Sequence, residues 1–270
     1  MIQGAPFRVG LVQMVSTPSV PENISSAAKL VAEAAGLGAK LVVLPEYFCI
    51  LGMRDTDKVA AREENGAGPI QDFLAEAAKR HGVWLVGGSV PLACPDPGKV
   101  RNSCLVYDAE GRRVARYDKI HLFGLELGAE RFDEAKTIAP GDRPCAVESP
   151  FGRIALSVCY DVRFPELYRA LAPMDIILVP SAFTATTGRA HWETLLRARA
   201  IENLAWVLAP AQGGTHANGR QTHGHSMVVD PWGKVVAERA TGAGVVVADI
   251  DPAFQQKMRR GLPALTHRVL

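Results

Sequence analysis

Three side chains with useful chemistry follow short apolar runs of the sequence. Glu46 follows residues 41–45, Lys119 follows a strand-like run, and Cys159 ends the run 154–158. Catalytic groups in layered α/β folds are usually placed at the ends of strands. A thiol, a carboxylate and an ammonium group could together attack a carbonyl carbon, move a proton and stabilise negative charge. Taken singly, each also fits a plainer role as a buried cysteine, a surface carboxylate or a solvated lysine.

The surroundings of Cys159 favour a reactive thiol. A helix is expected to begin shortly after it, and a thiol near a helix N-terminus and a lysine is biased toward thiolate. A cysteine–histidine pair with His191 or His121 as base is the rival arrangement. Seven histidines make some such pairing easy to draw, so we do not favour it.

His223 and His225 are spaced so that both could ligate a metal ion from one strand. No Asp, Glu or Cys lies at a sequence spacing from them that is typical of metal ligands. A structural or catalytic zinc ion needs three or four ligands. We therefore interpret this segment as a polar loop and expect no metal site.

Composition excludes several classes of protein. The chain has 270 residues, of which 48% are hydrophobic, and 30 basic residues nearly balance 28 acidic ones. The sequence shows no basic stripe of the kind that binds nucleic acid. The N-terminus lacks the pattern of a secretory signal, and no apolar run reaches the ~18 residues of a membrane span. Five cysteines without a CxxC spacing argue against a disulfide framework, so we expect reduced thiols in the cytoplasm.

Strand-like and helix-like segments alternate, which is typical of an α/β fold. In the first half we predict strands at 7–14, 41–44 and 83–86, a hairpin of 103–108 with 112–117, and helices at 22–35 and 69–80. In the second half we predict strands at 152–159, 175–179 and 205–209, a hairpin of 226–230 with 234–237, and helices at 165–172 and 190–203.

The second half repeats the order of the first. Residues 106–115 resemble 228–237, and Trp84 and Trp206 keep the same offset as these two segments. A sheet covered by helices on one face leaves its other face apolar, and packing two such sheets together buries both. We therefore predict a four-layer α-β-β-α sandwich in one domain over residues 1–270. The alternative is a chance likeness among common strands.

Three blocks of sequence carry a specific resemblance. Residues 44–46 (Leu-Pro-Glu), 117–122 (Tyr-Asp-Lys-Ile-His-Leu) and 159–166 (Cys-Tyr-Asp-Val-Arg-Phe-Pro-Glu) resemble the signature blocks of the nitrilase superfamily of carbon–nitrogen hydrolases. They occur in family order and span almost the whole chain. The resemblance implies the same four-layer fold, a homodimer, a small-molecule substrate and no metal or organic cofactor.

The resemblance also implies a mechanism. Glu46 would act as general base for Cys159, whose sulfur attacks the amide carbon to give a tetrahedral intermediate and then a thioester. Lys119 and the backbone N–H of Tyr160 would stabilise the oxyanion. Glu46 would then activate the water that releases the acid.

A second carboxylate is expected to hold Lys119 in place. In related sequences a glutamate before a Thr/Ser-x-x-Pro-Gly segment has this role, and residues 132–141 match that stretch. We therefore choose Glu134, with Glu126 and Glu130 as nearby competitors.

Further segments resemble the Nit branch of the superfamily, which includes amidases of deaminated glutathione and of α-ketoglutaramate. These segments are residues 180–183, 187–193, 197–202 and 224–233. The third and fourth look more like the deaminated glutathione amidases. Hydrolysis of carbamoyl amines or nitriles uses the same three residues and stays open. A catalytically silent binding protein on the same fold is a remote alternative.

Both Nit-branch substrates carry a carboxylate beside a keto group, which calls for a cation. Arg163, just past Cys159, is the candidate, and an ion pair with Asp161 or Glu166 is its equally plausible structural role. By resemblance, the other residues expected near the substrate are Tyr47, Tyr160, Phe183 and Thr187.

Overall fold

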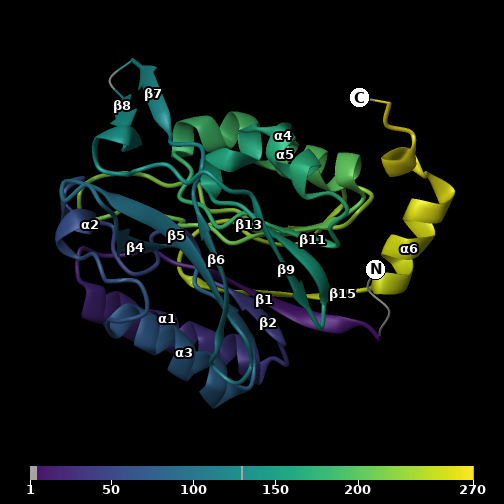
Figure 1. Ribbon diagram of the computed structural model, residues 1–270, viewed down its shortest axis with the longest axis horizontal. Coiled ribbons are helices and arrows are strands. Elements are labelled where there is room, and N and C mark those ends of the chain that lie inside the picture. The colour runs from purple at the N-terminus through teal and green to yellow at the C-terminus, as the bar shows by residue number, and fades with distance from the viewer. Residues whose placement is uncertain (1–4, 129, 270) are drawn as a thin grey trace.

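Two β-sheets lie face to face between two layers of helices in the computed structural model, which describes residues 5–128 and 130–269. Figure 1 shows α1 and α3 on one outer side of the strands and α4 and α5 on the other. The predicted four-layer α-β-β-α sandwich is thus confirmed.

The first sheet combines the N-terminal strands with one strand from the C-terminal region. Its order is β15-β1-β2-β3-β5-β4, with β6 paired to β5. Its strands are β1 (Phe7–Gln13), β2 (Leu41–Val43), β3 (Trp84–Val86), β4 (Val90–Ala93), β5 (Val100–Tyr107), β6 (Arg113–Asp118) and β15 (Gly244–Ile250). The helices of this half are α1 (Val20–Gly36), the short α2 (Asp57–Ala60) and α3 (Pro69–His81).

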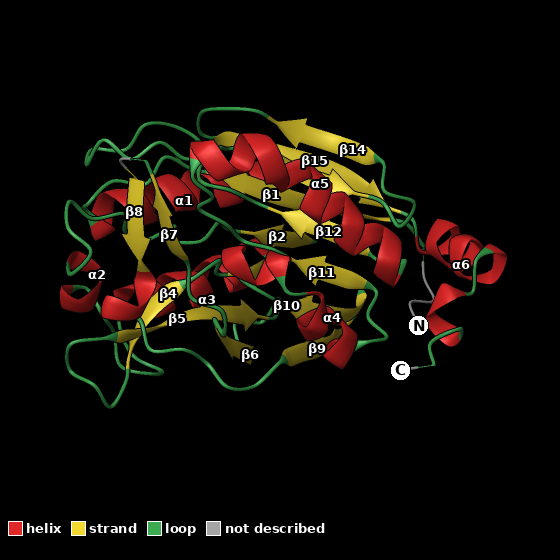
Figure 2. Ribbon diagram, turned by 90° about the horizontal axis from the view of Figure 1, so that it is seen from above, coloured by secondary structure: helices red, strands yellow, loops and turns green. Residues whose placement is uncertain are grey.

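The second sheet has the order β14-β13-β12-β11-β10-β9. Its strands are β9 (Cys145–Ser149), β10 (Gly152–Leu156), β11 (Ile176–Leu178), β12 (Trp206–Ala209), β13 (Ser226–Val229) and β14 (Val235–Arg239). It is covered by α4 (Pro165–Leu171) and α5 (Ala185–Asn203). A hairpin of β7 (Gly124–Leu127) with β8 (Glu130–Asp133) lies at one end of the sandwich, and α6 (Pro252–Gly261) lies at the opposite end (Figure 2).

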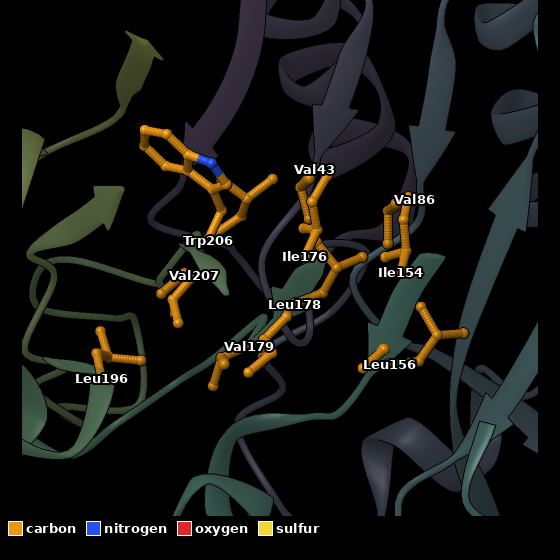
Figure 3. Close-up of a cluster of buried hydrophobic side chains, with 14 of the residues drawn as sticks. Val43, Val86, Ile154, Leu156, Ile176, Leu178, Val179, Leu196, Trp206 and Val207 are labelled. Atoms are coloured by element: carbon orange, nitrogen blue, oxygen red, sulfur yellow. The ribbon is translucent and has the colours of Figure 1, made fainter. Parts of the chain in front are cut away.

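Alternation along the strands builds two cores. Leu41 and Val43 belong to a cluster between the two sheets, whereas Val42 and Leu44 belong to a cluster beneath α1 and α3. Successive side chains of a strand point to opposite faces, so one short strand supplies both clusters. Figure 3 shows Val43 and Val86 facing Ile154, Leu156, Ile176 and Leu178 across the inter-sheet core. Burying each such side chain contributes about 1.5–3 kcal/mol.

Local signals set the helix boundaries. The hydroxyl of Ser19 caps α1 by accepting from the Glu22 N–H, and Pro21 lies in its first turn. Gly10 lets α1 approach β1, because a Cβ there would lie 2.8 Å from the Cβ of Ala34. Helix α5 begins at Ala185, earlier than the predicted residue 190, because Thr184 caps it.

The predicted repeat appears as two parallel triplets, β1-β2-β3 and β10-β11-β12, each followed by an antiparallel hairpin. Two features differ from the prediction. Strand β15 pairs with β1 along its whole length, so the first sheet also draws on the second half of the chain. Strand β10 ends at Leu156 instead of Cys159, because the chain turns into a 3₁₀ segment, Cys159–Arg163.

Within the described ranges 5–128 and 130–269, no helix has both the length and the apolar character needed to cross a membrane.

Candidate active site

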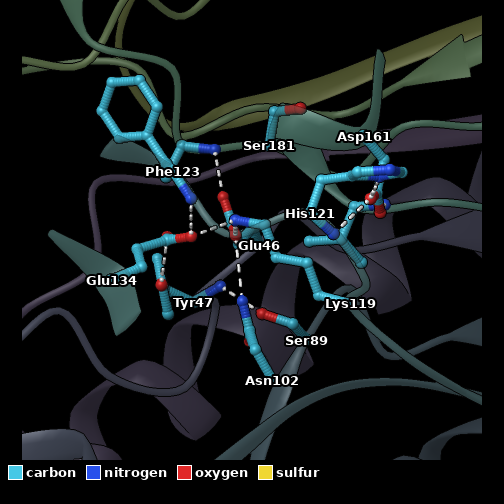
Figure 4. Close-up of polar contacts among 12 residues, drawn as sticks. Glu46, Tyr47, Ser89, Asn102, Lys119, His121, Phe123, Glu134, Asp161 and Ser181 are labelled. Atoms are coloured by element: carbon cyan, nitrogen blue, oxygen red, sulfur yellow. Dashed lines mark hydrogen bonds and ion pairs between the residues drawn. The ribbon is translucent and has the colours of Figure 1, made fainter. Parts of the chain in front are cut away.

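The polar residues that follow β2 and β6 meet in a buried ion-pair network. Lys119 Nζ lies 2.9 Å from Glu46 Oε1 and 2.8 Å from Glu134 Oε2. Lys119 is 0% exposed and Glu46 is 1% exposed. Figure 4 shows the lysine reaching between the two carboxylates. Among the glutamates proposed to hold Lys119, the structure thus brings Glu134 to it, whereas Glu126 contacts Arg131.

Glu46 is held by donors from three parts of the chain. Its Oε1 accepts from Lys119 and from Asn102 Nδ2 at 3.0 Å, and its Oε2 accepts from the Ala182 N–H at 2.9 Å. Gly88 packs against the backbone just before Glu46, because a Cβ at Gly88 would lie 2.0 Å from the carbonyl oxygen of Pro45. The carboxylate is therefore fixed before any substrate arrives, which favours catalysis.

Glu134 is fixed in the same way. It accepts from the Phe123 N–H at 2.7 Å and from the Tyr47 hydroxyl at 2.8 Å, besides contacting Lys119. Tyr47, expected near the substrate, therefore contacts the carboxylate that holds the lysine. It is not among the residues that line the cavity described below.

The charges in this network stabilise one another. Burial acts to lower the pKa of Lys119, but the carboxylates of Glu134 and Glu46 outweigh it and raise that pKa above its ordinary value. Burial likewise acts to raise the pKa of Glu134, but Lys119 beside it holds that pKa below its usual range. The lysine is thus a fixed positive charge and Glu134 a fixed negative one.

Cys159 opens the 3₁₀ segment that follows β10 and is 7% exposed. Its φ of 51° lies in the left-handed region, which is sparsely populated by non-glycine residues and clusters at functional sites. Burial, together with the charge of Glu46, raises the pKa of its thiol well above the ordinary value, and Lys119 offsets only part of this. The expected bias toward thiolate is therefore wrong for the free protein, because burial was not visible in the sequence.

Asp161 ties the cysteine turn to the segment that carries Lys119. Its carboxylate accepts from the Tyr117 hydroxyl at 2.8 Å, the His121 N–H at 3.0 Å and the Val158 N–H at 2.8 Å. The His121 ring also contacts Asp161 and stacks on Phe164. His121 thus has a structural partner of its own.

A small cavity opens beside Cys159. Its lining residues are Glu46, Phe123, Glu134, Cys159, Tyr160, Ala182, Phe183, Thr184, Thr187 and Arg220. Three of the residues expected near a substrate, Tyr160, Phe183 and Thr187, are among them.

Arg163 lies just outside this lining. Its guanidinium covers the rings of Tyr160 and Phe183, with its Cζ 5.7 and 5.4 Å from their centroids. Both of its terminal nitrogens are 3.2 Å from His191 Nδ1. Among the described residues it makes no ion pair with Asp161 or Glu166, the structural role considered from the sequence.

Several residues of the site escaped the sequence analysis. Asn102 lies between Arg101 and Ser103 at the start of β5, where its residue type gave no distinct signal. Ala182 and Phe123 contribute through their backbone N–H groups, which no side-chain pattern reveals. Arg220 comes from a polar loop whose path depends on the fold.

The histidine pair considered as a metal site has other contacts. The rings of His223 and His225 stack, with centroids 4.3 Å apart, and His225 bonds to Glu238. Burial lowers the pKa of His223 to about 4. Within residues 5–128 and 130–269, no group of three or more His, Cys, Asp or Glu side chains is arranged to hold a metal ion.

Comparison with known proteins places this site in context. The family model "Carbon-nitrogen hydrolase" matches residues 8–260. A deaminated glutathione amidase from Synechocystis sp. is 40% identical over 98% of both chains, and omega-amidase NIT2 from Xenopus tropicalis is 36% identical over 98% of this chain and 95% of its own. The crystal structure of Saccharomyces cerevisiae Nit3, a member of branch 10 of the nitrilase superfamily, superposes with a TM-score of 0.91 at 30% identity. It covers 100% of this chain and 99% of that one.

Proposed function

Because the chain belongs to the carbon–nitrogen hydrolase family, we propose that it is an amidase that cleaves a small carboxylated amide through a thioester on Cys159. The observation that carries the proposal is the buried Glu46–Lys119–Glu134 network, whose two carboxylates line the same cavity as the cysteine. Fixed charges of both signs beside a thiol suit acyl transfer.

In the first half-reaction Glu46 takes the proton of the Cys159 thiol as the sulfur attacks the amide carbon. The raised pKa of this thiol supports the need for a base when the sulfur attacks. Lys119 and the backbone N–H of Tyr160 stabilise the oxyanion. The carbon–nitrogen bond then breaks, Glu46 returns the proton to the leaving nitrogen, and the acyl group stays on sulfur.

In the second half-reaction Glu46 takes a proton from water, and the resulting hydroxide attacks the thioester carbon. The carbon–sulfur bond breaks, the acid leaves, and the proton returns to the thiolate. Glu134 acts on both steps indirectly, since it holds Lys119 at 2.8 Å and is itself held by Tyr47. Glu134 and Tyr47 are therefore positioning residues.

Deaminated glutathione is the proposed substrate, and α-ketoglutaramate is the second candidate. The two molecules share one acyl group, with a carboxylate beside a keto group, and differ in the leaving group, which is cysteinylglycine or ammonia. A relative named deaminated glutathione amidase and one named omega-amidase NIT2 match this chain over nearly its full length, at 40% and 36% identity. The higher identity supports the first candidate.

We also propose that residues 1–270 act as one catalytic domain and that the protein works as a homodimer in the cytoplasm. A small molecule is the proposed partner, without nucleic acid or membrane. The near-neutral net charge of +2 supports the absence of a polyanionic partner.

The test compares cysteinylglycine release from deaminated glutathione with ammonia release from α-ketoglutaramate, for the wild type and Cys159→Ala. We expect a higher kcat/KM with deaminated glutathione and loss of both activities in the variant. A preference for α-ketoglutaramate would reassign the substrate and keep the mechanism. Activity that survives Cys159→Ala would refute the mechanism.

A further inference from the structure

Arg220 is the cation among the residues that line the cavity beside Cys159. It lies in the loop between β12 and β13. The loop holds it firmly, because its N–H donates to Asn218 Oδ1 at 2.9 Å and its carbonyl accepts from the His216 N–H at 2.9 Å. The guanidinium covers the ring of Phe132, with its Cζ 5.2 Å from the centroid. The side chain is thus directed into the site from a fixed backbone.

The hydrogen bonds of this guanidinium are incomplete. Nη2 donates to the neutral carbonyl of Ala182 at 2.7 Å, while Nε is buried and has no partner. Among the described residues no carboxylate lies within ion-pair distance of it. The residue as a whole is half-buried, whereas Nε itself is shielded from water. A buried donor without a partner is costly, and the donors of a guanidinium match the two oxygens of a carboxylate. An entering anion would therefore supply the partner that Nε lacks.

The acidic residues around the cavity do not supply that anion. Glu46 and Glu134 are engaged with Lys119 and with backbone N–H groups. Glu130 bonds through Oε1 to Thr186, and its buried Oε2 also lacks a partner. Glu130 and Arg220 also line a second, more open groove, here called the outer groove, together with Arg131, Thr186 and Arg189. They form no ion pair there. The guanidinium therefore remains available to an external ligand.

Arg163 is less suited to the same task. It lies behind the rings of Tyr160 and Phe183 and both its terminal nitrogens contact His191. Arg220, by contrast, lines the cavity itself together with Cys159. The cation predicted from the sequence thus lies outside the cavity lining, and a cation that the sequence did not indicate lies within it.

We propose that Arg220 binds the substrate carboxylate and thereby determines the preference for acidic acyl groups. The inference rests on the proposed function for the identity of the substrate. The juxtaposition of Arg220 with the thiol can be tested without any amide hydrolysis.

The direct test is alkylation of Cys159 by a pair of reagents that differ in charge. Iodoacetate and iodoacetamide react alike, since the thiolate sulfur displaces iodide and a carbon–sulfur bond forms. Mass spectrometry of the peptide carrying Cys159 gives the rate with each reagent. We expect Arg220→Gln to lower the iodoacetate-to-iodoacetamide rate ratio about tenfold, equivalent to ~1.4 kcal/mol. Arg220→Lys should fall between the two.

Two variants serve as comparisons. Arg131→Gln removes an exposed arginine of the outer groove that is paired with Glu126, and it should keep the ratio within about twofold. Arg163→Gln should do the same. A large drop in Arg163→Gln with none in Arg220→Gln would overturn the assignment. So would an equal loss of both rates in Arg220→Gln, which would indicate a structural role.

Kinetics then separate binding from chemistry. With α-ketoglutaramate, Arg220→Gln should raise KM about 10- to 100-fold, as expected for a hydrogen bond to a charged group. With the methyl ester of the same amide, KM should change little. An equal effect on acid and ester would refute the proposal. If the wild type hydrolyses neither substrate, the proposed function fails, and the alkylation ratio still decides the role of Arg220.

Discussion

The two halves of the molecule share a topology and differ in what their strand ends carry. In the first half Leu41 pairs with both Val9 and Trp84, and in the second Ile176 pairs with both Ile154 and Trp206. These matched registers let equivalent positions be identified. Glu46 lies five residues after Leu41, and Ser181 lies five residues after Ile176, so the two occupy equivalent positions.

The other catalytic candidates are equally one-sided. Cys159 lies five residues beyond Ile154, and the equivalent position beyond Val9 is Met14. Lys119 follows β6, and the equivalent residue after β14 is the exposed Thr241. The proposed base and the lysine therefore come from one half and the proposed nucleophile from the other. Duplicating an α/β layer supplies two similar frames, and one active site forms between them from unlike residues.

Among the variants that test this difference between the halves, Cys159→Ala should lower activity most. We expect kcat to fall by about 10⁴-fold or more, as for loss of other catalytic nucleophiles. Met14→Leu is the matched control at the equivalent position. It conserves volume and should cost less than ~1.5 kcal/mol of stability with activity close to wild type. Steady-state kinetics and thermal unfolding of both variants provide the measurement, and comparable activity losses would contradict the asymmetry.

Glu46→Gln should lower kcat by about 10²- to 10⁴-fold, the usual contribution of a general acid–base group. The same change removes a negative charge that raises the pKa of Cys159. Because the lower pKa of the thiol offsets the loss of the base, alkylation of Cys159 by iodoacetamide at pH 7 should slow far less than amide hydrolysis does. Equal losses of alkylation and hydrolysis would indicate a residue that only holds the fold.

Ser181→Ala is the control for Glu46→Gln in the other half. The Ser181 hydroxyl donates to the Val179 carbonyl at 2.9 Å, so its loss should cost about 1 kcal/mol of stability. Turnover should stay within a few-fold of the wild type. A loss of turnover as large as that of Glu46→Gln would show that the equivalent positions are not functionally different.

Glu134→Gln should have a smaller effect than loss of the base, because Glu46 still contacts Lys119. We expect about a 10- to 100-fold fall in kcat with little change in KM, which corresponds to one charge-assisted hydrogen bond of ~1.5–3 kcal/mol. Tyr47→Phe removes only the neutral hydrogen bond to Glu134 and should lower kcat about fivefold. Equal effects of the two variants would argue against a role for the charge.

The smallest predicted effect is on stability as a function of pH. The pKa of Glu134 is lowered in the folded protein, so its carboxylate stabilises the fold above the unfolded value of about 4.3. That contribution is lost as the pH falls through the folded pKa. Urea unfolding between pH 7 and pH 3 should show a shallower loss of stability in Glu134→Gln than in the wild type. A parallel slope in both proteins would contradict the assigned shift.

Local patterns predicted the parts of the fold that depend on local sequence. The continuous apolar run of residues 41–44 and the turn signals of the hairpins indicated the right strands. Strand β15 was not predicted, although its three consecutive valines form a strand-like run. Its pairing with β1 joins the two ends of the chain, and no local pattern names a partner so distant. The four-layer order followed from the repeat, since two one-sided sheets must cover each other.

The residues of the site likewise divide into those predicted from the sequence and those that depend on the fold. Recognisable sequence blocks contained Glu46, Lys119, Cys159 and Glu134. In the structure the two glutamates and the cysteine line one cavity, and the lysine contacts both glutamates. The direction of Arg163 depends on His191, which is distant in sequence, and the position of Arg220 depends on a loop path. The protonation of the thiol was mispredicted because burial arises from packing.

The proposed mechanism requires a thioester at Cys159, and rapid acid quenching followed by peptide mass spectrometry tests for it most directly. Deaminated glutathione and α-ketoglutaramate differ only in the leaving group. Both should therefore give the same mass increase, that of one α-ketoglutaryl group, on the peptide that carries Cys159. An adduct on another residue, an adduct that retains the leaving group, or turnover without any adduct at every quench time would contradict the mechanism.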